Sequence, residues 1–368
     1  MLKLGSLFDG IGGFPYAAKK AGILPIWASE IEKAPISITK RHFPEMAHLG
    51  SITELDGANI EPADIITFGS PCQDLSITGS RAGLSGERSG LFMHAIRLIK
   101  EMRNATRNNY PTRIVWENVP GAFSTNKGED FEKVVEAVAG IAEGGISVAR
   151  PSGGWQSAGA VLGNGWSLAW RVLDAQFWGV PHRRRRIFLV ADFGGGAAAE
   201  ILFEQESRAW DAGQSEAEVQ RGARIFERRA DEYTADLGHS ADRIQVNPRI
   251  AVTLKSQGGG GGAKTGLYCL PVPYICRGFG DYAQGDIGKT LLARYDVTTM
   301  DLIATKYGVR VLTPMECERA QGFPDGWTEY GHNGKRISDT QRYRALGNSV
   351  AIPCVKYIMG NMAKHNRH

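Results

Sequence analysis

Short apolar runs and amphipathic stretches alternate along the first part of the chain. The apolar runs predict strands at 3–8, 23–30, 64–70 and 112–118. Apolar residues at helical spacing predict helices at 14–22, 33–43, 91–103 and 129–143. Two later runs, 166–175 and 185–193, have the pattern of strands that pair antiparallel. Because strands alternate with helices, we expect an α/β fold whose mostly parallel sheet is covered on both faces.

Chemically capable side chains follow several of these predicted strands. Asp9, Glu30, Cys72 and Glu117 lie at or just after the end of a strand. In open α/β sheets, ligands bind beyond the carboxyl ends of the strands. The pattern therefore predicts that these four residues share one edge of one sheet, where a functional site would form.

The alternating pattern stops after residue 193. "FGGGAAAE" at 193–200 has the composition of a linker, and 194–306 shows weak periodicity and a five-glycine run. We expect residues 194–306 to form a second, smaller domain of irregular or β-rich structure. The glycine run is interpreted either as a surface loop or as a nucleic-acid contact. Residues 307–368 regain a pattern and are expected to return to the first domain, 1–193, ending in a turn and an amphipathic helix.

Composition adds broad limits to this picture. The net charge of +4 and the isoelectric point near 8.7 permit a polyanionic partner without requiring one. The five cysteines have no regular spacing, and no histidine completes a zinc site near Cys269 and Cys276, so free thiols, a reducing compartment and no metal are expected. Cys317 and Cys354 lie in apolar patterns and are predicted to be core residues. The sequence shows no secretory signal and no membrane-span-length apolar run, which predicts an intracellular, cytoplasmic protein.

Three local motifs have both a structural and a chemical interpretation. The turn in "SLFDGIGGF" with Glu30 after the next strand is typical of a nucleoside-containing cofactor site, although a simple tight turn gives the same pattern. Cys72 in "GSPCQDLS" is either a half-buried structural cysteine or a nucleophile. The four arginines at 183–186 form either a solvated basic patch or, because they enter a strand, a face of alternate functional side chains.

Taken in order, these motifs resemble one family. "SLFDGIGGF", "GSPCQDLS", "WENVPG", "WGVPHRRRRIFLV", "LTPMECERAQGFPDGW" and "RALGNSVAIP" are similar to the motifs of the DNA (cytosine-5)-methyltransferases. The resemblance runs from about residue 4 to residue 358 and implies a Rossmann-like, S-adenosylmethionine-dependent methyltransferase fold. Residues 194–306 then correspond to the target-recognition domain. They contain no recognition motif that we identify, so the DNA target sequence stays open.

The resemblance assigns catalytic roles to four residues. Cys72 would add as a thiolate to carbon 6 of cytosine, and Glu117 would hold or protonate N3 of the ring. Arg184 and Arg186 would contact the flipped base and its backbone, whereas Arg183 and Arg185 would point elsewhere. His182 stands where the family has glutamine. Residues 73–90 would form a lid over the base that the enzyme flips out of the duplex.

The resemblance also implies a pocket for S-adenosylmethionine. Phe8 would flank the adenine, Gly10 and Gly12 would let the backbone approach the methionine portion, and Glu30 would hold the ribose. Ile31 takes a place that is often aromatic, and Ser51 takes a place that is often aspartate, which predicts modest cofactor affinity. The remaining expected contacts come from Ile52, Leu91, Asn348, Ser349 and Val350.

Several alternatives stay open at this point. The expected partner is double-stranded DNA, bound by a monomer that serves a restriction–modification system or acts as a solitary phage-type methylase. An RNA cytosine-5 methyltransferase and a catalytically inactive DNA-binding relative are the rival interpretations. The length of the variable region favours duplex DNA over RNA, and the presence of both Cys72 and Glu117 argues against an inactive relative.

Overall fold

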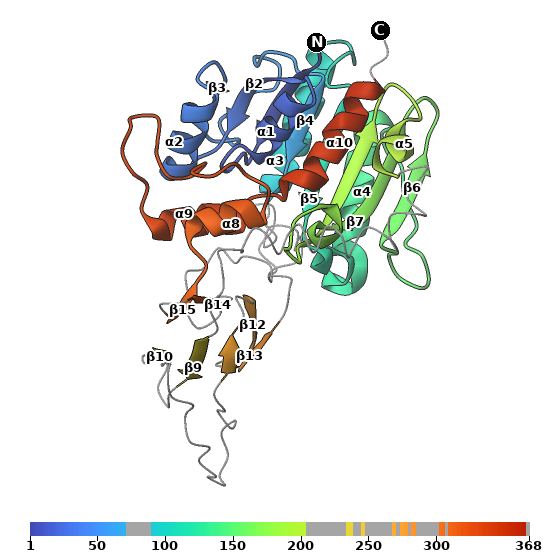
Figure 1. Ribbon diagram of the computed structural model, residues 1–368. Coiled ribbons are helices and arrows are strands. Elements are labelled where there is room, and N and C mark those ends of the chain that lie inside the picture. Colours follow the sequence, from blue (N-terminus) through green and yellow to red (C-terminus); the bar gives the residue numbers. More distant parts are fainter. Residues whose placement is uncertain are drawn as a thin grey trace.

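An eight-stranded sheet forms the centre of the fold (Figure 1). The structure, a computed structural model, describes residues 1–70, 90–203 and 312–365 in full, and between 204 and 311 only the backbone of strands β9 to β15. The strand order is β3-β2-β1-β4-β5-β8-β7-β6. These strands are β1 (Lys3–Leu7), β2 (Leu24–Ser29), β3 (Ala47–His48), β4 (Ile65–Phe68), β5 (Arg113–Asn118), β6 (Ala158–Leu162), β7 (Ser167–Asp174) and β8 (Arg185–Asp192).

Five neighbouring strands, β3, β2, β1, β4 and β5, run parallel. The sheet is extended by β8, β7 and β6 in antiparallel pairing, as expected for β7 and β8. Gly5 on β1 lies against Trp27 on β2, and a Cβ at Gly5 would lie 2.1 Å from the indole ring. A glycine is therefore required there for the two strands to pair around this buried tryptophan.

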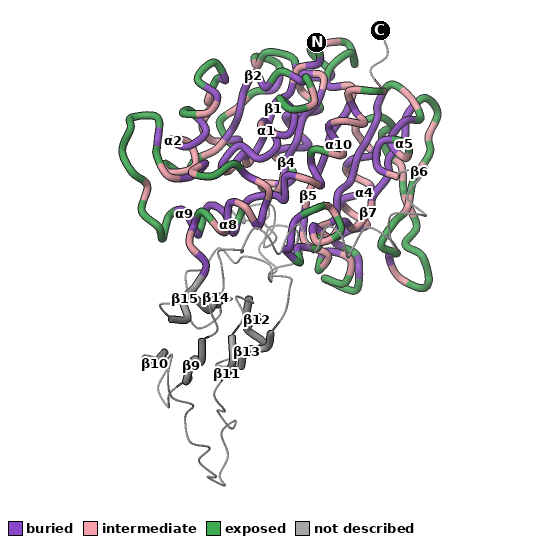
Figure 2. Tube along the Cα trace, viewed as in Figure 1, coloured by how far each residue is buried: buried purple, intermediate pink, exposed green. Residues whose placement is uncertain are grey.

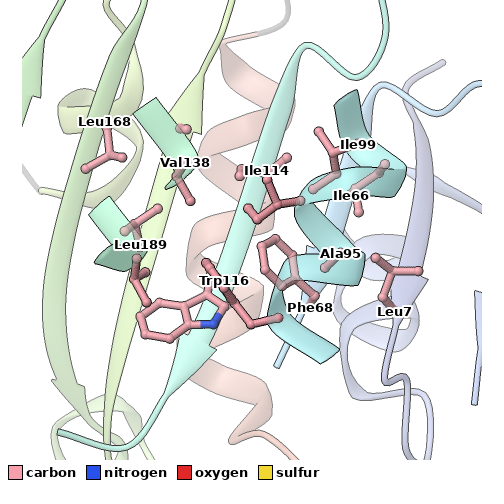
Figure 3. Packing of buried hydrophobic residues seen from close by; sticks show 14 of the residues in the cluster. Leu7, Ile66, Phe68, Ala95, Ile99, Ile114, Trp116, Val138, Leu168 and Leu189 are labelled. Atoms are coloured by element: carbon pink, nitrogen blue, oxygen red, sulfur yellow. The ribbon is translucent and has the colours of Figure 1, made fainter. Parts of the chain in front are cut away.

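Helices cover both faces of the sheet, and two apolar clusters fill the space between. The central strands of the sheet are largely buried (Figure 2). Side chains of β4 and β5 alternate between the clusters: Ile66, Ile114 and Trp116 lie in the cluster with α3 and α4 (Figure 3), whereas Ile65 and Val115 lie in the cluster with α1, α5 and α10. This two-sided burial explains why Ile65 and Ile66 of β4 and the run Ile114–Trp116 of β5 are apolar on both faces. The helices are α1 (Gly13–Lys20), α3 (Leu91–Ala105), α4 (Glu129–Ala142), α5 (Ala198–Leu202) and α10 (Ile352–Lys364), with short 3₁₀ turns at Pro120–Phe123, Thr125–Gly128 and Ala175–Trp178.

A third apolar cluster joins the end of the chain to its beginning. Helices α8 (Pro314–Ala320) and α9 (Asp339–Asn348) pack with α2 (Lys33–His42) through residues that include Ile38, Leu346 and Trp327. The Trp327 indole donates to the carbonyl of Ile11 at 2.9 Å, and its ring stacks on His42. The last segment of the chain thus packs against the first.

Some local expectations from the sequence are wrong. The stretch expected to be a linker at 193–200 turns into α5, whose Ala198, Ile201 and Leu202 are buried beneath β7 and α10. The segment at 343–362 is two helices, α9 and α10, and not one turn and one helix. Strands β3 and β6, which lie at the two edges of the sheet, were not expected. Cys317 and Cys354 are buried core residues, as predicted.

The described part of the second segment is built of antiparallel strands. One sheet has the order β10-β9-β11 and the other β13-β12-β14-β15, apart from the main sheet in Figure 1. This matches the expectation of β-rich structure, while the glycine run lies outside the described residues. The strands are β9 (Tyr233–Leu237), β10 (Ile244–Val246), β11 (Leu267–Cys269), β12 (Pro273–Gly278), β13 (Asp281–Gln284), β14 (Leu302–Thr305) and β15 (Gly308–Val311).

None of the helices in the described ranges combines the length and the apolar character that crossing a bilayer requires.

The buried Glu318–Arg342 ion pair yields a stability prediction. Glu318 is fully buried and accepts from Arg342 at 3.1 Å and from the backbone amides of Thr328 and Gly326 at 2.8 and 2.7 Å. Glu318→Ala leaves the Arg342 guanidinium buried without this partner, so it should lower the free energy of unfolding by about 3–5 kcal/mol. Urea denaturation measures the loss.

Asp325→Asn provides the matched control, because it breaks the exposed ion pair of Asp325 with Arg319. Exposed pairs contribute about 0–1 kcal/mol, so this variant should stay close to the wild type. Equal losses in the two variants would show that the buried pair has no special role.

Candidate functional site

The parallel strands bring their carboxyl ends to one edge of the sheet. β1 lies between β2 and β4, so the chain reverses its direction of travel across the sheet at the gap between β1 and β4. Asp9, Glu30 and Glu117 all lie at this edge, at the ends of β1, β2 and β5. This confirms three of the four residues expected there. Cys72 and the expected lid at 73–89 lie outside the described residues.

The turn after β1 has a backbone that favours glycine. Gly10 and Gly12 have φ of +57° and +79°, in the left-handed region, and Phe8 is a non-glycine residue with φ of 54°. A Cβ at Gly10 would meet no atom within 4 Å, so the turn is open on that side. The strained Phe8 backbone and the open space beside Gly10 are the features expected of a turn that holds a ligand.

Glu30 ties this turn to the end of β2. Its carboxylate accepts from the amide of Gly10 at 2.9 Å through one oxygen, and from the amides of Ile31 and Glu32 at 2.7 and 2.9 Å through the other. The carboxylate is therefore fixed in place while it remains partly exposed. Ile31, the neighbouring candidate, is 70% exposed. An apolar side chain this exposed, beside a fixed carboxylate, suits contact with a flat apolar ring.

The loop after β3 and the start of α3 border the same edge. Ser51 is half-buried, and its hydroxyl interacts with that of Thr53 at 2.7 Å. Ile52 is buried, and its carbonyl accepts from Arg97 of α3 at 3.2 Å, which fastens the loop to that helix. Leu91, the first residue of α3, is half-buried. These three candidates thus belong to two segments that contact each other.

The break between α9 and α10 lies against the start of α1. Ser349 and Val350 are buried, whereas Asn348 is exposed. A Cβ at Gly13 would lie 2.6 Å from Val350 and 3.3 Å from the Ser349 hydroxyl. The absence of a side chain at Gly13 lets this C-terminal loop pack directly on the helix that follows the glycine turn. The structure therefore places Asn348, Ser349 and Val350 beside the predicted cofactor turn.

Glu117 and Arg186 face each other from adjacent strands. The Arg186 Nε lies 3.0 Å from Glu117 Oε1, and both side chains are largely buried. Glu117 also lies over Gly69, where a Cβ would be 3.2 Å from its Oε2. A carboxylate and a guanidinium with fixed orientations can together bind a planar group that has both hydrogen-bond donors and acceptors.

Ser70 is anchored beside this pair, two residues before Cys72 in the sequence. Its carbonyl accepts from the Asn118 side chain at 3.1 Å, and its hydroxyl accepts from the Trp116 indole at 3.4 Å. Asn118 also accepts from the amide of Val119 at 2.8 Å. Sequence reasoning missed Asn118 as a positioning residue. Its place directly after Glu117 at a strand end, followed closely by a proline, was the available signal.

The four arginines alternate as the strand pattern predicts. Arg183 and Arg185 are exposed, Arg186 is half-buried, and Arg184 is 2% exposed. The Arg184 guanidinium donates to the carbonyls of Gly347 and Ser349. Arg184 therefore contacts the C-terminal loop, which the sequence does not indicate. His182 is buried beside it.

Asp9 is a buried carboxyl at the same edge. The pKa of Asp9 is raised to about 7. Burial is the main cause, the charge of Glu30 also raises the pKa, and the hydrogen bond from Ser6 opposes both effects. Asp9 Oδ1 accepts from the Ser6 hydroxyl at 2.6 Å. Its other oxygen is buried with no hydrogen-bond partner. Such a group holds its proton to neutral pH.

Comparison with known proteins decides the family. The family model "C-5 cytosine-specific DNA methylase" matches residues 2–142 and 160–364, which is most of the chain. The chain belongs to this family. The resemblance that the sequence motifs indicate is thereby confirmed, and S-adenosylmethionine is the cofactor of the fold.

Individual relatives share between a quarter and a third of their residues with this methylase. It is 28% identical, over 98% of its length, to a DNA N-6-adenine-methyltransferase of Escherichia phage P1, of which it spans 61%. It is 25% identical to the Type II methyltransferase M.HhaI of Haemophilus parahaemolyticus, with 98% of this chain and 94% of the relative covered. The chain is similar to these proteins, and the activities in their names describe the relatives.

Solved structures confirm the fold of the methylase. The S. pombe Dnmt2 methyltransferase superposes with a TM-score of 0.64 at 18% identity, covering 98% of each chain. A putative DNA modification methyltransferase from an E. coli prophage gives 0.55 at 19% identity, covering 99% of each chain. At such low identity the likeness establishes the Rossmann-like methyltransferase fold.

The residues present fit S-adenosylmethionine. The open glycine turn offers backbone amides, and the fixed Glu30 carboxylate retains lone pairs for ribose hydroxyls. Ile31, Ile52 and Leu91 supply apolar surface for an adenine ring. In the described part of the chain, no cluster of three or more histidine, cysteine and acidic side chains has the geometry to hold a metal ion.

The anchoring of Ser70 predicts a catalytic effect for Asn118. Asn118→Ala removes the donor to the Ser70 carbonyl and frees the segment that leads to Cys72. Loss of one buried hydrogen bond costs about 1–3 kcal/mol, so kcat should fall roughly tenfold or more while the KM for S-adenosylmethionine changes little. Steady-state kinetics with both substrates varied measures this. A selective rise in the cofactor KM would contradict it.

The pKa of Asp9 predicts a pH dependence of stability. An unfolded aspartate ionises near 3.8, whereas native Asp9 keeps its proton up to about pH 7. The native state therefore binds more protons in this range, and its stability falls as pH rises, with a slope of up to about 1.4 kcal/mol per pH unit. Asp9→Asn should remove this slope in urea titrations. A difference between wild type and variant that does not change with pH would contradict the expectation.

Proposed function

We propose that this chain transfers a methyl group from S-adenosylmethionine to carbon 5 of a target cytosine in duplex DNA, with Cys72 as the nucleophile. The observation that carries the proposal is the anchoring of Ser70, two residues before Cys72, beside the Glu117–Arg186 pair. The chain thus enters the segment with Cys72 at the strand ends that carry Glu117, which supports a shared site for the thiol and the target base. The family to which the chain belongs supports the same reaction.

The chemistry requires a nucleophile because carbon 5 of cytosine does not attack unaided. The Cys72 thiolate forms a bond to carbon 6, and the electrons displaced toward N3 make carbon 5 able to attack. The cofactor supplies the methyl group on a positively charged sulfur. Carbon 5 would bond to the methyl group as the bond from methyl to sulfur breaks, and S-adenosylhomocysteine would be the leaving group. Loss of the carbon-5 proton to water would then expel the Cys72 thiolate and restore the aromatic ring.

Glu117 and Arg186 would stabilise the charge that this addition places on the ring. Glu117 would face the edge with N3 and the amino group, holding or donating the proton at N3. Arg186 would donate to the ring oxygen while its ion pair keeps the carboxylate in place. In the free protein the two groups satisfy each other, so the site is oriented before the base arrives.

Duplex DNA is the proposed substrate, and the target base must leave the stack to reach this edge. The proposed division is a catalytic body of residues 1–203 and 307–368 with a target-recognition domain within 204–306. The first boundary lies after residue 203, and not after 193 as the sequence predicts, because α5 packs into the catalytic body. The protein would act as a monomer in the cytoplasm of a prokaryotic or phage-infected cell, consistent with its bacterial and phage relatives.

Bisulfite sequencing of DNA from cells that express the chain tests this function. Methylated cytosines within one short motif are expected from the wild type, and none from Cys72→Ala or Cys72→Ser. Cys317→Ala, at a core position outside the proposed site, is the cysteine control and should retain methylation once thermal melting shows that it folds. Quantifying N6-methyladenine in the same DNA checks the activity named for the phage P1 relative.

Folded protein that leaves cytosine unmodified in DNA, or full methylation by Cys72→Ala, would contradict the proposal. Methyl transfer to RNA in place of DNA would support the RNA methyltransferase interpretation. DNA binding without any transfer would support an inactive relative.

A further inference from the structure

Arg184 is almost fully buried and donates hydrogen bonds to the segment where α9 ends. Its guanidinium Nη2 donates to the Gly347 carbonyl at 3.1 Å and to the Ser349 carbonyl. Its backbone amide donates to Asp174 at 3.0 Å, which fixes the start of β8. A buried guanidinium with two carbonyl acceptors is committed to that place, because moving it outward would leave those acceptors unsatisfied.

The acceptors of Arg184 belong to the end of a helix. α9 ends at Asn348, and the amide of its C-cap residue, Ser349, donates to the Leu346 carbonyl. The carbonyls of Gly347 and Ser349 come at the end of the helix, where the regular intrahelical donors run out. They also carry the partial negative charge of the helix C-terminus, so a cation there is stabilising. Arg184 thus satisfies these groups and fixes the direction in which the chain leaves α9.

The other side of this loop lies on the cofactor turn. Val350 and Ser349 pack on Gly13, the first residue of α1, directly after the glycine turn. The Gln321 side chain donates to the Leu346 carbonyl at 2.6 Å, which gives the end of α9 a further contact. Only Asn348 of this stretch is exposed, between buried neighbours. The loop therefore lies between Arg184 and the predicted cofactor turn.

We propose that Arg184 is a positioning residue for the cofactor: it fixes residues 347–350, the last two residues of α9 with the two that follow (loop 347–350), against the glycine turn. It thereby sets the affinity for S-adenosylmethionine, and it makes no contact with a DNA phosphate. This deepens the proposed function and rests on it. Arg186, two residues further on, belongs to the base site through Glu117. One strand start would thus support the cofactor loop and the base pocket through two different arginines.

Two binding measurements on purified protein test the assignment without turnover. Calorimetric titration with S-adenosylhomocysteine gives the cofactor Kd. Titration of a target-containing DNA duplex at several salt concentrations gives the slope of log K against log salt, which changes by about 0.9 for each DNA phosphate that the protein no longer neutralises. The variants are Arg184→Gln, Arg184→Lys and the exposed neighbour Arg185→Gln as the matched control.

Arg184→Gln should raise the Kd for S-adenosylhomocysteine about tenfold or more and leave the salt slope unchanged. Arg184→Lys keeps a charge near the carbonyls and should have a smaller effect. Arg185→Gln should leave the cofactor Kd at the wild-type value. If Arg184→Gln does not fold, as judged by thermal melting, the lysine variant provides the same comparison.

An unchanged cofactor Kd in the Arg184 variants, a salt slope reduced by about 0.9, or an equal rise in Kd for Arg185→Gln would each overturn the proposal. A wild-type protein that fails to bind S-adenosylhomocysteine would overturn it as well. If the wild type binds this ligand but methylates no DNA, the proposed function fails, while the role of Arg184 in cofactor binding is still decided by the variants.

A double-mutant cycle adds a second route to the same answer. Gly13→Ala pushes on Val350 from the opposite side of the loop, because its Cβ would lie 2.6 Å from that side chain. If both changes act through loop 347–350, their effects on the cofactor Kd should be less than additive. Strict additivity would mean that Arg184 does not act through this loop.

Discussion

Parallel pairing among β2, β1, β4 and β5 is the constraint on which the rest of the structure depends. It brings the ends of four strands to one edge, although the residues that follow them are far apart in the sequence. It also buries both faces of β4 and β5, so their positions are fixed by packing on two sides. A turn or loop attached to such strands begins from a defined place, which the proposed chemistry on a flipped base requires.

The C-terminal helices pack against the N-terminal helices. α8 and α9 pack against α2, α10 packs against α1, and the loop between α9 and α10 rests on Gly13. The proposed cofactor side of the edge is thus built from both ends of the chain, while the proposed base side is built from β5 and β8. The start of β8 contacts both sides. Arg184, directly before the strand, bonds to the end of α9, and Arg186, within it, is paired with Glu117.

Much of this arrangement could be predicted from the sequence. Strong helical periodicity placed α3 and α4, and the apolar runs placed β1, β2, β4, β5, β7 and β8. The glycine turn and Glu30 also lie where expected. The failures have physical causes: the alanines of α5 are small and have no distinctive pattern, yet tertiary packing makes them a helix. Likewise, alternation assigned Arg184 to the functional face, but only the fold shows that this face is covered by loop 347–350.

Attack of Cys72 on a cytosine brought to this edge can be detected by covalent trapping. A duplex whose target cytosine carries fluorine at carbon 5 allows addition and methyl transfer but leaves no proton to remove, so the thiol stays bonded to carbon 6. Mass spectrometry of the digested complex should then identify one DNA adduct, on Cys72, formed only with S-adenosylmethionine present. An adduct on another residue, or none from protein that methylates ordinary DNA, would contradict the account.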